Sequence, residues 1–194
     1  FFEAAEDAEW RNEPLYIPDR EAMIWDKTHP LEQIRWTQEK NKNCNGHYIN
    51  VVKCLKWWRK EKYPDVKHPK SYPLEHFIGD CCPDGIESVA EGTTLTLEKI
   101  VIDYPTKPFL PDRGVPEHDV FARLSDEDYQ AFYNSVCEAA TVARKAFEAD
   151  SIQESAKLWR ELFGNKFPEP PQPKDTIFTE RKSDSRDIPG GRFA

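Results

Sequence analysis

Apolar side chains recur at helical spacing through the middle of this chain, and that spacing restricts the folds open to it. In the stretch "GHYINVVKCLKWWRKEK", apolar residues stand at i, i+3, i+4, i+7 and i+10, which predicts a helix with one buried face. That stripe consists of Tyr48, Val51, Val52, Leu55 and Trp58. The same period returns over 86–101 and again over 129–163. The sequence therefore predicts a mainly α protein whose body is a compact helical bundle.

The last two helices have recognisable starts. Ser125 is followed three residues later by an acid, and Ser151 is followed at the same distance by Glu154, which is the capping-box pattern. Gly164 comes directly after the final apolar residues, where a glycine commonly ends a helix. We expect one helix to end near Phe147, and a second to run from Ile152 to this glycine.

The stretch "HPKSYPLEHF" contains another predicted helix start. Ser71 stands where an N-cap belongs, and Pro73 falls in the first turn, where a missing N–H costs little. The helix is expected over 72–82, because Pro83 follows it. On the preceding helix Lys53, Lys56 and Lys60 share a face of their own, and spacing alone favours a solvated surface for them.

The flanks of the bundle differ from it in composition. Residues 1–26 mix aromatic and acidic residues around "LYI", which predicts an extended segment with a short strand. The stretch 104–119 contains four prolines and predicts a loop. Residues 168–194 are rich in proline and charge, which predicts a flexible C-terminal tail. The domain boundaries expected from the sequence are therefore 1–26, 27–167 and 168–194.

Charge and cysteine usage limit the surroundings and partners of the chain. A net charge of −8 argues against binding long DNA or RNA, and no apolar run is long enough to cross a membrane. Five cysteines, an odd number without disulfide spacing, indicate a reducing, cytoplasmic setting. Cys81 and Cys82 with His76 could form part of a zinc site, but no CxxC pair exists, so we expect no metal site.

The sequence contains no set of motifs that defines a complete active site. Asp126 and Asp128 form a D-x-D pattern, but they lie in a predicted helix cap with no glycine-rich loop before them. The phosphate-binding motifs GxxxxGK[ST] and GxGxxG do not occur. The metalloprotease motif HExxH and the nucleophile-elbow motif GxSxG are absent too. The chain on its own is not expected to be a complete catalyst.

Several stretches together resemble a known family. The pair "NVVKCLKWWRK" and "KSYPLEHF" is similar to the C-terminal lobe of template-independent nucleotidyltransferases. The phrases "KPFLPDRGVPEHDVFARLSDEDYQAFY" and "ESAKLWRELFGNKFP" resemble the closing segment of bacterial CD-NTases, the cGAS/DncV-like enzymes, and the likeness covers about residues 10–168. It implies that Lys56 and Ser71 contact a donor triphosphate and that Tyr72 stacks on its base. Lys53 is a weaker candidate, and Lys70 takes part of the serine's role if the register shifts by one.

The resemblance also implies what the chain lacks. Members of the family carry a GS motif, a D-x-D and a third aspartate in an N-terminal α/β lobe, where they hold two Mg²⁺ ions. None of these is recognisable here, and the chain opens at Phe1 without a methionine. We therefore expect the C-terminal part of a longer enzyme, with its catalytic residues and Mg²⁺ in the other lobe. That enzyme would make cyclic di- or oligonucleotide messengers from nucleoside triphosphates in antiphage (CBASS) defence.

Two further hypotheses concern interactions. The ending Pro-Gly-Gly-Arg-Phe-Ala resembles C-termini that ubiquitin-transfer-like enzymes attach to targets, which would make Gly190, Gly191 and Ala194 a conjugation tail; the alternative is an end that merely frays. A different class of function also fits the residues. In that reading the chain is a non-catalytic helical protein-interaction module whose lysine face and tail bind a protein partner. For the site residues the structural alternative is that Ser71 only caps, Tyr72 only packs and Lys56 is solvated.

Overall fold

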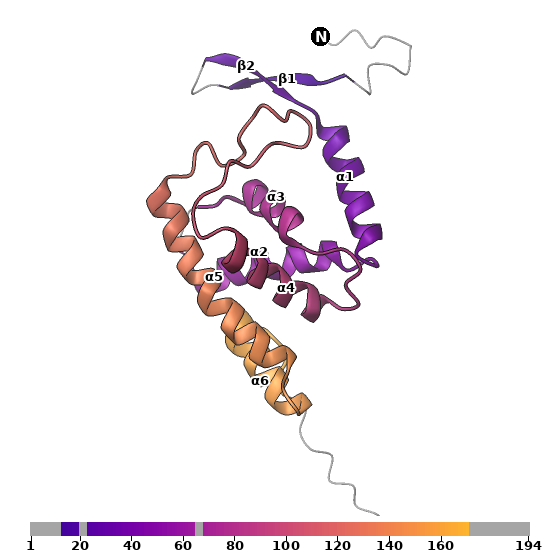
Figure 1. Cartoon of the computed structure of the whole chain (residues 1–194), viewed down its shortest axis with the longest axis vertical. Coiled ribbons are helices and arrows are strands. Elements are labelled where there is room, and N and C mark those ends of the chain that lie inside the picture. Colours follow the sequence, from indigo (N-terminus) through magenta and orange to yellow (C-terminus); the bar gives the residue numbers. More distant parts are fainter. Residues whose placement is uncertain (1–12, 20–22, 65–67, 171–194) are drawn as a thin grey trace, which may run out of the picture.

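The computed structural model describes residues 13–19, 23–64 and 68–170, and within them it is mainly helical (Figure 1). The predicted helical body with a short extended N-terminal segment is confirmed. In chain order, the elements are β1 (Leu15–Asp19), β2 (Ile24–Thr28), α1 (Pro30–Asn43), α2 (Tyr48–Lys62), α3 (Ser71–Cys81), α4 (Val89–Asp103), α5 (Asp126–Phe147) and α6 (Ile152–Phe163).

The two strands form an antiparallel hairpin at one end of the molecule (Figure 1). Leu15 pairs with Thr28 and Ile17 with Asp26, so the predicted "LYI" strand is confirmed, whereas its partner β2 was not expected. Large apolar side chains of the hairpin face outward: Tyr16 is 58% exposed and Trp25 is 69% exposed. The hairpin therefore lies beside the helical core and contributes little to it.

Helix α1 leads from the hairpin to the bundle, and the sequence pattern did not indicate it. His29 is its N-cap and accepts a hydrogen bond on Nδ1 from the Glu32 N–H, while Pro30 occupies the first turn. None of the described residues within the helix is fully buried. Because α1 presents no apolar stripe to a core, hydrophobic periodicity could not reveal it.

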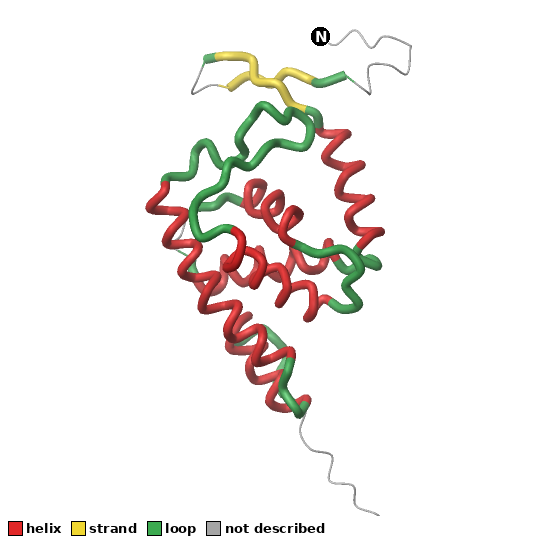
Figure 2. Tube along the Cα trace, viewed as in Figure 1, coloured by secondary structure: helices red, strands yellow, loops and turns green. Residues whose placement is uncertain are grey.

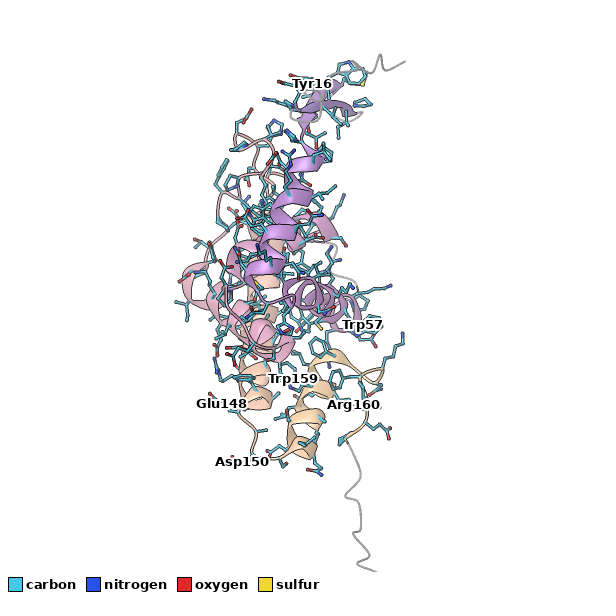
Figure 3. All side chains as sticks on the ribbon, turned by 90° about the vertical axis from the view of Figure 1, so that its right-hand side faces the viewer. Tyr16, Trp57, Glu148, Asp150, Trp159 and Arg160 are labelled. Atoms are coloured by element: carbon cyan, nitrogen blue, oxygen red, sulfur yellow. The ribbon has the colours of Figure 1, made fainter. Side chains whose placement is uncertain are left out.

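Helices α2 to α6 enclose the core. All five predicted stripe residues of α2 are buried, and those of α5 contribute Tyr129, Phe132 and Val136. Helix α6 folds back along α5 (Figure 2). Figure 3 shows Trp57 of α2 close to the end of α6, where its indole N–H donates to the Phe163 carbonyl at 2.9 Å. Ile152, the first residue of α6, is 72% exposed and lies outside the core.

The predicted caps of α5 and α6 are confirmed. The Ser125 hydroxyl accepts from the Asp128 N–H and the Ser151 hydroxyl from the Glu154 N–H, both at 3.1 Å. Gly164 ends α6 with a φ of 84°, a conformation that glycine adopts without a steric penalty. Helix α4 begins at Val89 after the cap Ser88, three residues later than the apolar period had indicated.

The predicted loop between α4 and α5 runs over the start of α3, below the hairpin (Figure 2). Pro111 and Asp119 form an isolated bridge that closes part of it, and Leu110 and Phe121 anchor it in the core. This arrangement brings the loop, α1 and the first turns of α3 together. Most of the predicted tail, including Gly190, Gly191 and Ala194, lies outside the described residues.

Candidate functional site

Lys56 points toward α3. Its apolar neighbours on α2 bury the opposite face, and the Lys56 ammonium forms an ion pair with the Glu75 carboxylate of α3. The side chains of this pair are 30% and 38% exposed, so both charges remain accessible to solvent. Glu75 stands one turn after Ser71, which places the lysine charge close to the start of α3.

Ser71 is not the N-cap that its position in "KSYP" suggested. Helix α3 begins with Ser71 as its first residue, and Lys70, in an extended conformation with φ −63° and ψ 169°, is the N-cap. A lysine side chain has no acceptor, so it cannot cap the N–H groups of the first turn. The serine is exposed. It stands at a helix end where the Lys70 side chain accepts no hydrogen bond from the first amide groups.

Tyr72, the next residue, is 42% exposed and its ring lies edge-on to His76, with ring centres 5.9 Å apart. Its hydroxyl donates to the Asp112 carboxylate. The pKa of the Tyr72 phenol is raised well above its usual value. Burial is the larger cause, and the hydrogen bond to Asp112 is the second. One part of the ring is therefore accessible while its polar end is occupied.

The direction of α2 distinguishes among its basic residues. Arg59 donates to the carbonyl of Pro69, just before α3, whereas Lys56 reaches Glu75 inside α3, so the two helices run in opposite directions here. Lys53 is therefore one turn further from the start of α3 than Lys56 and is exposed. The structure brings Lys56, Ser71 and Tyr72 into one region and leaves Lys53 at its margin. Sequence reasoning missed Arg59, whose contact with Pro69 has no local signal.

A cleft of about 920 Å³ opens beside Tyr72, between the hairpin and the loop after α4. Tyr72 and Lys70 line it, together with Lys27 and His118. Lys56 and Ser71 are not among the residues that line it, so Tyr72 belongs to the cleft while the lysine and the serine do not.

The described residues do not fit a magnesium centre. Within them, no three His, Cys, Asp or Glu side chains gather closely enough to hold a metal ion. Asp126 and Asp128 belong to the first turn of α5, where the Asp128 N–H is bound by the Ser125 cap. Across residues 13–19, 23–64 and 68–170, no helix combines the length and apolar character that crossing a bilayer requires.

The sequence is similar to those of known bacterial enzymes. The sequence is 48% identical over 202 residues to a cyclic AMP-AMP-GMP synthase from Enterobacter hormaechei subsp. hoffmannii, an alignment covering 99% of this chain and 53% of that protein. It is 33% identical over 158 residues to a cyclic AMP-AMP-AMP synthase from an Acinetobacter species, covering 78% of this chain and 46% of that protein. No family model matches. The chain thus spans about half the length of the curated relatives it matches.

The fold gives the same result. The structure of CdnC from E. coli MS115-1 with ATP superimposes with a TM-score of 0.64 at 16% identity, over 84% of this chain and 58% of that one. The relatives are named as synthases of cyclic oligonucleotides, and the chain shares its fold with part of CdnC. This chain belongs to the CD-NTase family, the cGAS/DncV-like nucleotidyltransferases, as its sequence resemblance had predicted.

Proposed function

We propose that this chain is the nucleotide-binding helical part of a synthase that makes cyclic di- or oligonucleotide messengers from nucleoside triphosphates. The observation that carries the proposal is the meeting of Lys56 with the first turns of α3 at an exposed position. The relatives named above are cyclic-oligonucleotide synthases, which supports the same activity for the full-length gene product. We further infer a cytoplasmic role in antiphage defence.

A triphosphate fits the start of α3 on electrostatic grounds. The first-turn N–H groups carry a partial positive charge and bind anionic oxygens, and the Ser71 hydroxyl can donate to the same group. Lys56 adds a full charge, and a charge-assisted hydrogen bond contributes about 1.5–3 kcal/mol. Glu75 competes with the phosphate for this lysine, so binding would require Lys56 to exchange or share its partner.

The Tyr72 ring is the surface on which a base would stack. Stacking of a base on an aromatic side chain contributes about 1–3 kcal/mol and tolerates every base, because each base has a π-face. Such tolerance suits a family in which one relative is named for AMP-AMP-GMP and another for AMP-AMP-AMP. In this proposal, Tyr72 holds the base without choosing it.

The remaining parts of the proposed machinery lie elsewhere. Mg²⁺, held by carboxylates of a second lobe, would supply the charge stabilisation that nucleotidyl transfer requires. The tail residues Gly190, Gly191 and Ala194 remain a proposed substrate for a ubiquitin-transfer-like enzyme.

Steady-state kinetics of the full-length gene product test the phosphate site. Lys56→Ala and Ser71→Ala are each expected to raise the KM for ATP, by about tenfold or more for the lysine. Lys157→Ala, on the exposed face of α6, removes the same charge far from α3 and is the matched control, with no expected change. An unchanged KM in both site variants would rule out the assignment.

A further inference from the structure

The Tyr72 hydroxyl is held by groups from two other segments. It donates to Asp112 Oδ2 in the loop after α4, and it accepts from Gln33 Nε2 of α1 at 2.5 Å. Gln33 Nε2 also lies 3.4 Å from the same carboxylate oxygen. A phenol, an amide and a carboxylate from three separate parts of the chain therefore form one closed set of contacts.

Asp112 is itself fixed by its second oxygen. Oδ1 accepts from the backbone N–H groups of Gly114 at 2.8 Å and Val115 at 3.1 Å. Burial acts to raise the pKa of Asp112, but the hydrogen bonds from Tyr72, Gly114 and Val115 outweigh it and hold the pKa below its usual value. The carboxylate is therefore ionised at neutral pH and divides its two oxygens between the loop and the tyrosine.

The adjacent residue strengthens the same junction. The Arg113 guanidinium stacks on Trp36 of α1 and donates to the His76 carbonyl at 2.8 Å and to Asp80 at 2.9 Å. At Gly114 a Cβ would lie 2.5 Å from the Cβ of His29, so the loop approaches the start of α1 as closely as a glycine permits. Consecutive loop residues thus join α1 to α3 twice, and the position of Asp112 is firmly set.

These contacts determine what Tyr72 can offer to a ligand. Its hydroxyl already donates to Asp112, so it has no second proton for hydrogen bonding to a base. The ring, 42% exposed and edge-on to His76, is the part left to make contact. A side chain held before binding loses less conformational entropy when a partner stacks on it.

We propose that Asp112, together with Gln33, is a positioning residue that fixes the Tyr72 ring for stacking against the base of the bound nucleotide. This inference rests on the proposed function, in which Tyr72 holds the base, because it names the residues that keep Tyr72 in position. Asp112 acts through Tyr72 and makes no contact with the nucleotide in this arrangement.

Tyr72→Phe in the full-length gene product is the decisive test, since it removes the hydroxyl and leaves both the ring and the loop contacts of Asp112. We expect the KM for ATP to rise about three- to tenfold, the equivalent of one lost hydrogen bond, with kcat within about twofold of the original. Tyr72→Ala removes the stacking surface as well and is expected to raise KM further.

A rescue experiment separates positioning from general loop stability. In Asp112→Asn the single carbonyl oxygen is needed for the Gly114 and Val115 N–H groups, so the new NH₂ faces the Gln33 amide donor. KM is expected to rise as in Tyr72→Phe. Adding Gln33→Glu replaces the amide donor by a carboxylate, which can accept hydrogen bonds from both the new NH₂ at position 112 and the Tyr72 hydroxyl. The double variant should return to within about twofold of the original KM, which a purely structural role of Asp112 would not produce.

The outcomes distinguish the two proposals. If Tyr72→Ala leaves the KM for ATP unchanged, Tyr72 holds no base, and both its role in the proposed function and this inference fail. If Tyr72→Ala raises KM but Tyr72→Phe does not, the stacking role survives and the positioning role of Asp112 is overturned. If Asp112→Asn does not fold, the result for Tyr72→Phe still decides.

Discussion

The guanidinium of Arg113 lies over the Trp36 ring of α1, with its central carbon 3.4 Å from the ring centre. This contact matters because α1 has no fully buried residue of its own among those described. A cation–π contact contributes about 0.5–2 kcal/mol, more as it is shielded from water, and the Arg113 side chain is only 12% exposed. The loop after α4 therefore holds α1 in place, and α1 in turn carries Gln33 to Tyr72.

Gly79→Ala is expected to destabilise the protein at this stack. A Cβ at Gly79 would lie 2.6 Å from the Trp36 ring and would also overlap the Arg113 guanidinium. Alanine favours a helix by about 1 kcal/mol over glycine, but displacing the packed Trp36 and Arg113 side chains costs about 1–3 kcal/mol. Thermal unfolding should show a lower midpoint, and the loss should shrink in a Trp36→Leu background. A raised midpoint in Gly79→Ala alone would contradict the packing described.

Ser71→Ala and Ser125→Ala are expected to differ in stability, because only the second serine is a cap. The Ser125 hydroxyl accepts from the Asp128 N–H, and losing such a cap costs about 1 kcal/mol. Ser71 is the first helical residue after Lys70, so its replacement should change the free energy of unfolding by less than about 0.5 kcal/mol. Chemical denaturation of both variants measures this. Equal losses would mean that Ser71 caps α3 after all.

Glu75→Gln is expected to strengthen nucleotide binding. The change releases the Lys56 ammonium from its ion pair and removes a negative charge near the proposed phosphate position. For partly exposed charges this amounts to about 0.5–1 kcal/mol, or a two- to fivefold lower dissociation constant for ATP. Calorimetric titration at low and high salt provides the measurement, and the gain should diminish at high salt. Weaker binding would show that Glu75 serves the ligand and does not compete with it.

His76 makes stability depend on pH. It is 2% exposed with Nε2 2.8 Å from the Pro111 carbonyl, and burial, then the nearby Arg113 charge, lowers the pKa of His76. The unfolded chain takes up this proton near pH 6.5 while the folded chain does not, so the free energy of unfolding falls as the pH drops below about 6.5. The fall from this group ends below the folded-state pKa.

The variant His76→Gln removes the histidine's contribution to the pH dependence of stability. Comparing it with the original protein separates that contribution from the effect of the carboxylates, which titrate in both. Chemical denaturation at about pH 7.5 and about pH 5.5 should show the stability difference between the original protein and the variant narrowing on acidification. A gap that stays constant or widens would place the His76 pKa at or above that of the unfolded chain.

The parts of the fold that local chemistry determines were predictable. The caps at Ser125 and Ser151 depend on hydrogen bonds across three residues, and the α2 stripe depends on a period visible within one helix. Helix α1 was missed because it has no buried stripe, and part of its attachment comes from Arg113, far along the chain. The error at Ser71 has a different cause: serine is the better N-cap residue, so the local signal favoured Ser71, whereas α3 begins one residue earlier, with Lys70 at the cap position.

The candidate site divides in the same way. Resemblance to a family indicated Lys56 and Tyr72, and the structure adds the supports around them. Asp112 lies 40 residues from Tyr72 and 79 from Gln33 along the chain, so no spacing rule connects them. Only the path of the loop over α3 brings these three polar groups together.

The double attachment by Asp112 and Arg113 also fixes the length of the loop at that point. Asp112 and Arg113 are adjacent, yet the first side chain serves the Tyr72 phenol while the second reaches the Trp36 indole. Inserting or deleting a single residue between Pro111 and Val115 would shift these side chains relative to Tyr72 and Trp36 and would break the turn that Asp112 forms with Gly114 and Val115. An engineered tag or a change in loop length is therefore better placed before Phe109, which is 62% exposed, than within these five positions.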